Sequence, residues 1–205
     1  MSDCREHSTE HVRLLKLRHN RGKGGAVRLG MLSARGRFLL MADADGASRF
    51  ADFEKLEKEL KEGHEGNEEL DGIAVGSRAH LEKESIAERS FFRTVLMLGF
   101  HFLVWLFAVR TVKDTQCGFK LFTRRTAARL FGNLHVEKWA FDVELLFLAE
   151  KRGIPVKEVA INWTEIEGSK LTPLAASVQM GRDLFLIWFW YFTGVWTYED
   201  KPKLE

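Results

Sequence analysis

The 205-residue sequence is poor in the features that define several protein classes. Its two cysteines, Cys4 and Cys117, form no C-x-x-C pair, which argues against a cysteine metal site and favours a reducing compartment. The seven histidines show no ligand spacing either. A net charge of +2 is too small to indicate a nucleic-acid partner. The first residues contain no apolar signal or anchor segment.

The composition is that of a globular protein. Apolar residues make up 45% of the chain and charged residues 29%, and neither an internal repeat nor a low-complexity segment interrupts it. A chain of this length can bury a sizeable core. We therefore expect a single domain over residues 1–205.

The most informative stretch is an apolar run that ends in two carboxylates. Phe38–Ala42 predicts a buried strand of a parallel sheet, and Asp43 and Asp45 follow it directly. Side chains two apart on a strand point the same way, and ligands of α/β sheets gather at the carboxyl ends of strands. Two hard oxygen donors there suit Mg²⁺ or Mn²⁺ together with substrate phosphates. An ordinary acidic turn is the alternative.

A glycine-rich segment precedes this strand. We expect a short strand at Leu14–Leu17, a loop over residues 21–25 and a helix over Ala26–Arg35, which together with Phe38–Ala42 would make a βαβ unit. Backbone N–H groups around Gly24 and the charge of Lys23 would attract a phosphate at the helix start. A flexible entry to the helix explains the glycines equally well.

The remaining pattern alternates helices with short strands. The expected helices are Phe53–Glu62, Glu84–Val109, Phe141–Lys151 and Met180–Trp196, and the expected strands are Ile73–Gly76, Lys120–Phe122 and Val156–Trp163.

Several cations and acids fall at the ends of these elements. Arg78 follows a strand, and Arg89 and Arg93 share a helix face, where guanidinium groups suit phosphate. A solvated face paired with neighbouring glutamates is the simpler explanation of those arginines. Further along, an acid, an amide and a base surround a glycine turn, namely Asp114, Gln116 and Lys120.

Another acid, Asp142, opens a helix, where a carboxylate also complements the helix dipole.

Two apolar segments suggest contact with a membrane surface. Thr94–Val109 spans roughly 24 Å as a helix, less than the ~30 Å hydrocarbon core. Leu184–Trp196 is rich in Trp and Tyr, which suit the headgroup level of a bilayer. We expect interfacial helices over about residues 91–109 and 184–196, with burial in the core as the alternative.

Taken together and in this order, seven stretches resemble the dolichyl-phosphate β-glucosyltransferases, inverting family 2 glycosyltransferases. The stretches are Asn20–Gly25, Met41–Gly46, Gly76–Ser85, Gly99–Trp105, Asp114–Phe122, Trp139–Leu146 and Asn162–Lys170. The D-x-D is common to GT-A enzymes, whereas residues 77–85 and 162–170 are far more specific.

The resemblance implies an α/β fold of the GT-A class: a Rossmann-like mixed sheet flanked by helices, with membrane-interfacial helices. It implies UDP-glucose as donor, dolichyl phosphate as acceptor, Mg²⁺ or Mn²⁺, and the cytosolic face of the endoplasmic reticulum membrane, where the product serves protein N-glycosylation. The implied roles are metal binding by Asp43 and Asp45, substrate binding by Lys23, Gly24, Arg78, Arg89, Arg93, Gln116 and Lys120, and base or orienting acid for Asp114 and Asp142.

The resemblance also implies an N-terminal truncation. The family begins with a membrane anchor and a first strand that helps hold the uridine, and neither is recognisable here, so the domain is expected to be partial and the sheet to lack its first strand. A catalytically impaired membrane-associated fragment, or the related dolichyl-phosphate mannosyltransferase, are the alternatives that the sequence leaves open.

Overall fold

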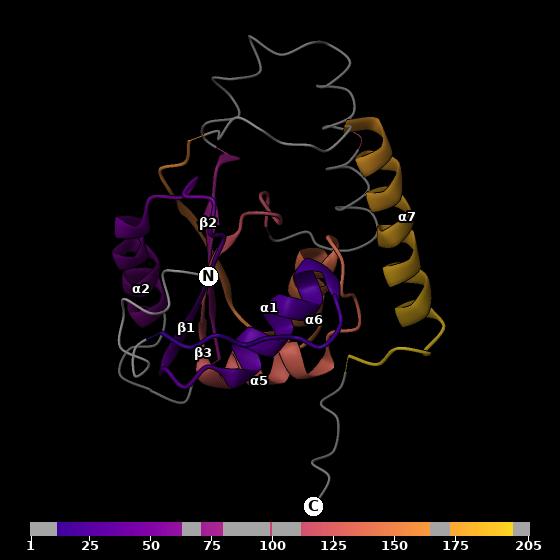
Figure 1. Cartoon of the computed structure of the whole chain (residues 1–205), viewed down its shortest axis with the longest axis horizontal. Coiled ribbons are helices and arrows are strands. Elements are labelled where there is room, and N and C mark those ends of the chain that lie inside the picture. Colours follow the sequence, from indigo (N-terminus) through magenta and orange to yellow (C-terminus); the bar gives the residue numbers. More distant parts are fainter. Residues whose placement is uncertain (1–11, 63–70, 80–98, 100–111, 165–172, 199–205) are drawn as a thin grey trace, which may run out of the picture.

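The computed structural model describes residues 12–62, 71–79, 99, 112–164 and 173–198. Within them, a mixed sheet has helix α2 on one face and helices α1, α5 and α6 on the other, with α7 outside α6 (Figure 1). The elements are α1 (Gly22–Ser33), β1 (Phe38–Ala42), the 3₁₀ turn η2 (Phe50–Asp52), α2 (Phe53–Glu62), β2 (Ile73–Ser77), β3 (Phe119–Thr123), α5 (Arg124–Asn133), α6 (Phe141–Lys151), β4 (Val156–Ala160) and α7 (Pro173–Phe192).

The strand order across the sheet is β1-β3-β2-β4. Strands β2 and β4 pair in parallel, whereas β3 lies between β1 and β2 and is antiparallel to both. The mixed sheet predicted from the family resemblance is therefore confirmed. The expectation that Phe38–Ala42 pairs within a parallel sheet is wrong, because its neighbour β3 runs the opposite way.

The N-terminal βαβ unit is also not formed as predicted. Leu14–Leu17 has no strand structure, and Leu14 and Leu15 are exposed. Helix α1 begins at Gly22, four residues before the predicted start, and ends at Ser33. The Asn20 side chain accepts a hydrogen bond from the Gly22 N–H at 2.9 Å, and Gly22 has a φ of 72° that favours glycine.

Other boundaries follow the sequence more closely. Helices α2 and α6 have the predicted ends, while β4 stops at Ala160, three residues early. Helix α5 was not predicted; the Thr123 side chain caps it by accepting from the Thr126 N–H. The predicted helix Glu84–Val109, with the interfacial segment 91–109, lies outside the described residues apart from Gly99.

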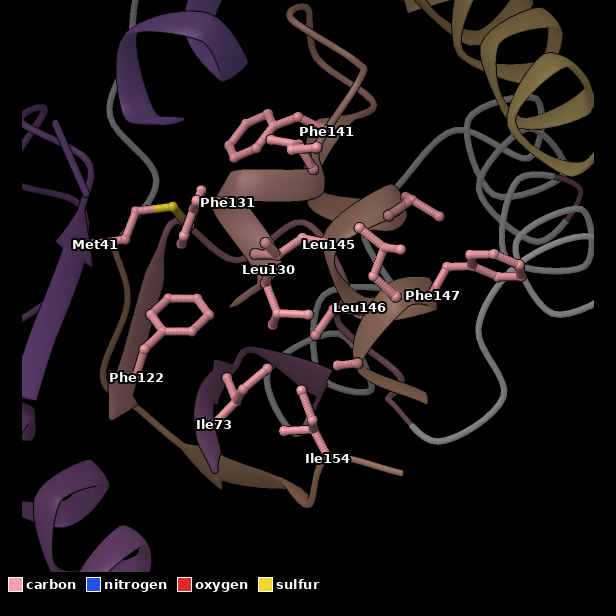
Figure 2. Packing of buried hydrophobic residues seen from close by; sticks show 14 of the residues in the cluster. Met41, Ile73, Phe122, Leu130, Phe131, Phe141, Leu145, Leu146, Phe147 and Ile154 are labelled. Carbon is pink, nitrogen blue, oxygen red and sulfur yellow. The ribbon is translucent and has the colours of Figure 1, made fainter. Parts of the chain in front are cut away.

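The core has two parts, one on each face of the sheet. Alternation along β3 turns Phe119 and Leu121 toward Leu56 and Leu60 of α2, and Phe122 toward the opposite helices. Figure 2 shows the larger part, in which Phe122 and Met41 meet side chains of α5 and α6. Because Lys120 lies between Phe119 and Leu121, its side chain points to the face opposite α2, where α6 begins.

One row of side chains on α7 packs against the core, and another row is exposed. Leu184, Ile187 and Tyr191 are buried against the core, whereas Phe185, Phe189 and Phe192 are exposed. None of the helices in the described part of the chain has the length and hydropathy needed to cross a membrane.

Candidate active site

Most of the predicted site residues meet at one edge of the sheet. Asp43 follows β1 and Arg78 follows β2, two strands that run in the same direction. Strand β3 runs the opposite way, so the turn before it, Asp114–Gly118, reaches the same edge. The Asp43 N–H donates to the Gly118 carbonyl at 2.9 Å, which joins the two segments directly.

The first part of the site is a half-exposed carboxylate beside a lysine. Lys23, in the first turn of α1, donates from Nζ to Asp43 Oδ2 at 2.8 Å. Asp45 is exposed, and its Oδ1 accepts from the Ala47 N–H at 3.0 Å. A Cβ at position 118 would lie 2.1 Å from Asp43 Oδ2, so only glycine leaves room for this carboxylate. Asp43 is thereby held beside a cation at the sheet edge.

The donor chemistry at this position fits Mg²⁺ or Mn²⁺. Asp43 and Asp45 bring carboxylate oxygens to an accessible loop, and such ions use one or two carboxylates plus substrate phosphates. In the described ranges, no three or more His, Cys, Asp or Glu side chains gather as a complete metal site. The two aspartates would therefore hold a metal only together with oxygens from a ligand.

The second part of the site is a buried ion pair. Lys120 Nζ donates to Asp142 Oδ1 and to the Cys117 carbonyl, both at 2.6 Å, and the lysine side chain is fully buried. Burial raises the pKa of Asp142, and the Lys120 ammonium opposes that rise. Burial also raises the pKa of the Cys117 thiol nearby. Lys120 thus ties the turn before β3 to the start of α6.

The third part of the site is the pair of Arg78 and Asp114. The guanidinium donates from Nε and Nη2 to the two carboxylate oxygens at 2.7 and 2.8 Å, and the Arg78 backbone N–H adds a bond of 2.9 Å. Burial would raise the pKa of Asp114, but the hydrogen bonds and charge of Arg78 outweigh it and hold that pKa below its ordinary value. Asp114 is therefore an ionised partner of Arg78.

Glu158 on β4 holds the backbone of the Asp114 segment in place. Its carboxylate accepts the backbone N–H of Asp114 at 3.1 Å and that of Lys113 at 3.2 Å. Sequence reasoning did not single out Glu158, because nothing in a strand residue's local pattern indicates that a distant loop will need its carboxylate.

Trp163 borders Arg78, and Asp52 holds the residue before that tryptophan; neither was predicted individually. The Arg78 Cζ lies 5.2 Å from the ring centroid of Trp163, which follows β4. The buried carboxylate of Asp52 accepts hydrogen bonds from Asn162, the residue before that tryptophan. The signal in the sequence that pointed to this region was the family resemblance of residues 162–170.

Four predicted residues, Gly24, Gln116, Arg89 and Arg93, take no part in these ion pairs as described. Gly24 lies inside α1 and is buried, and a Cβ there would be 2.7 Å from the Cβ of Phe141, so close packing explains this glycine. Gln116 is half-buried in the turn between Asp114 and β3. Arg89 and Arg93 lie outside the described residues.

The sequence of the chain is similar to those of several known proteins. The chain is 64% identical over 202 residues to a dolichyl-phosphate beta-glucosyltransferase of Drosophila melanogaster, covering 98% of this chain and 61% of that protein. It is 57% identical to a protein of the same name in Homo sapiens, with coverages of 98% and 62%, and 45% identical to one in Saccharomyces cerevisiae, with coverages of 95% and 59%. The chain thus spans less than two thirds of the length of these relatives.

A family model extends the same result. The model described as glycosyl transferase family 2 matches residues 2–131, a stretch that includes Lys23, Asp43, Asp45, Arg78 and Asp114. Since the match covers more than half of the sequence, the chain belongs to glycosyl transferase family 2.

Proposed function

We propose that the chain provides the transferase domain of a dolichyl-phosphate β-glucosyltransferase, which moves glucose from UDP-glucose to dolichyl phosphate. The observation that carries the proposal is the meeting of Lys23–Asp43 and Arg78–Asp114 at one sheet edge, in a chain whose relatives bear that enzyme's name. One pair offers groups for a nucleotide diphosphate, and the other offers a guanidinium for a lipid phosphate.

The reaction joins a phosphate oxygen of the acceptor to the anomeric carbon of glucose. The bond from that carbon to the diphosphate breaks, and UDP leaves with the electron pair. A phosphate monoester has a second pKa near 6, so the nucleophile is already largely ionised at pH 7. No strong general base is required.

The environments of the two candidate acids agree with that conclusion. Asp114 already accepts three hydrogen bonds from Arg78, and Asp142 is paired with buried Lys120. Both are better suited to orienting a cation than to removing a proton. We therefore assign them positioning roles rather than the role of base.

The leaving diphosphate needs positive charge. Lys23 lies at the sheet edge beside Asp43 and can turn its ammonium toward a phosphate oxygen. When bound by Asp43 and Asp45, Mg²⁺ or Mn²⁺ would supply further neutralisation of the leaving group.

We further propose that α7 lies against the cytosolic face of the endoplasmic reticulum membrane, where the acceptor's headgroup is found. Phe185, Phe189 and Phe192 form an exposed aromatic stripe, and the Trp188 ring stacks on Phe192 with centroids 5.1 Å apart. Such amphipathic aromatic helices favour the lipid headgroup region. The stripe would bring the sheet edge near a phosphate carried by a membrane lipid.

A transfer assay tests the proposed function. The chain would be incubated with dolichyl phosphate, Mg²⁺ or Mn²⁺, and either radiolabelled UDP-glucose or radiolabelled GDP-mannose. We expect lipid-linked label from UDP-glucose alone, and loss of it in Asp43→Asn. The exposed α2 variant Glu54→Gln removes a charge of the same sign away from the site and should retain activity. Transfer from GDP-mannose instead would contradict the proposal.

A further inference from the structure

Trp163 lies beside Arg78 because of how β2 and β4 pair. The two strands are parallel, with Ser77 opposite Ala160, and the Ile161 N–H donates to the Ser77 carbonyl at 3.2 Å. The residues that follow the strands therefore leave the sheet side by side. The Arg78 Cζ is 5.2 Å from the indole centroid, a distance at which a guanidinium and an aromatic ring attract each other.

The guanidinium of Arg78 is thus restrained in two ways. Asp114 engages the Nε and Nη2 edge, and the Trp163 ring lies within contact range of the charged carbon. A planar guanidinium is a side chain that suits recognition of phosphate. Restraining a long side chain beforehand lowers the entropy lost on binding.

The segment that carries Trp163 is itself fastened to the loop after Asp43 and Asp45. The Arg49 N–H donates to the Asn162 carbonyl at 3.1 Å, and the Thr164 N–H donates to the Ala47 carbonyl at 2.9 Å. Ser48 and Trp163 form a β-bridge between these contacts. The tryptophan therefore sits between the segment that follows the two aspartates and the arginine.

Buried Asp52 fixes the backbone of the segment that carries Trp163. Asp52 is 3% exposed, and its carboxylate accepts from the Asn162 N–H at 2.5 Å and from the Asn162 side-chain amide at 3.1 Å. Lys55 supplies a cation at 2.8 Å. A buried carboxylate bonded in this way holds the backbone next to Trp163 in one place.

We propose that Trp163 is a positioning residue that holds Arg78 toward the phosphate of the lipid acceptor, and that Asp52 sets Trp163 in place. The proposal rests on the proposed function, since it takes Arg78 to bind that phosphate. It assigns Trp163 a part in binding the acceptor and none in binding the nucleotide.

Vesicle binding provides the test. Phosphatidylcholine vesicles with and without dolichyl phosphate would be floated with each variant, and the increase due to dolichyl phosphate recorded as an affinity. We expect Trp163→Ala to weaken this component about tenfold, as a cation–π contact of this kind would. Trp163→Phe, which keeps a ring, should recover most of the loss, and the double variant with Arg78→Ala should bind no worse than Arg78→Ala alone.

Controls separate positioning from folding. Calorimetric titration of UDP with Mn²⁺ should give the same affinity for Trp163→Ala as for the unmodified chain, and Asp52→Asn should weaken acceptor binding in the same way. Phe50→Ala removes an exposed ring from the same loop region and should change neither quantity. If Arg78→Ala binds dolichyl phosphate normally, the acceptor role of Arg78 and this inference both fail. If Arg78→Ala is impaired but Trp163→Ala is not, only this inference is overturned.

Discussion

Replacing Lys120 by methionine tests whether the buried ion pair holds the site together. The substitution keeps a long side chain but removes the ammonium that contacts Asp142 and the Cys117 carbonyl, each at 2.6 Å. The Lys120 side chain is fully buried and that of Asp142 is 5% exposed. A pair this deeply buried leaves an uncompensated charge when one partner is lost, which costs about 3–5 kcal/mol. An exposed pair would cost at most about 1 kcal/mol.

Urea unfolding at pH 7 measures the loss. Lys120→Met should lower the free energy of unfolding by about 3–5 kcal/mol, a large part of a typical stability of about 5–15 kcal/mol. Adding Asp142→Asn should recover part of that loss, because it removes the orphaned charge. Two results would refute the reasoning: a loss below about 1 kcal/mol, or a double variant less stable than Lys120→Met alone.

The same pair has a pH signature. Because burial raises the pKa of Asp142 above its ordinary value of 3.8, ionising this group costs stability as the pH rises from 3.8 through the folded value. Lys120→Met lacks the ammonium that opposes this cost. The difference in free energy of unfolding between the variant and the unmodified chain should therefore shrink as the pH is lowered through that range. A deficit independent of pH would mean that the loss comes from packing alone.

Three further substitutions test other parts of the site. Gly118→Ala would place a methyl group 2.1 Å from Asp43 Oδ2 and displace that carboxylate. The Mn²⁺-dependent affinity for UDP, measured by calorimetry, should therefore fall by at least about tenfold. Unchanged affinity would contradict metal binding by Asp43. Tyr191→Phe removes the hydroxyl that donates to buried Glu144 at 2.8 Å, and urea unfolding should show a loss of about 1–3 kcal/mol; no loss would mean that the bond does not hold α7. The pKa of Asp114 is lowered by its arginine partner from 3.8, so its contribution to stability is complete above that pH and disappears as the pH falls through the lower folded value. In Asp114→Asn the free energy of unfolding should fall less steeply over this acid range than in the unmodified chain. An equally steep fall in the variant would contradict the prediction.

The sequence predicted the elements whose signals are local. Phe53–Glu62 and Phe141–Lys151 form helices with the predicted ends, and Phe38–Ala42 is the predicted strand, with Asp43 and Asp45 directly after it. In each case the apolar pattern of a short window determines the structure. The same approach placed the start of α1 too late, because glycines that indicate a loop in isolation are needed here for close packing, Gly24 against Phe141 and Gly22 against the Glu137 backbone.

The sheet illustrates the limit of local reasoning. Nothing within Phe38–Ala42 specifies whether its neighbour runs parallel or antiparallel, and the partner β3 follows some eighty positions later, from Phe119. Leu14–Leu17 has the residue types of a strand, yet it has no strand partner among the described residues. Pairing depends on contacts between segments distant in the sequence, which a window of residues does not contain.

By itself, the sequence determined which residue types stand at the ends of the strands, because apolar runs and turn residues mark those ends. Only the tertiary structure decided how these residues combine. Lys120 and Asp142 lie 22 positions apart, and Arg78 and Asp114 lie 36 apart, yet each pair is in direct contact. Alternation along β3 sends Lys120 to the side of α6, and the antiparallel course of β3 brings the turn with Asp114 to the edge where β2 ends. The partners of these charges follow from the direction of one strand, which is decided by packing across the whole sheet.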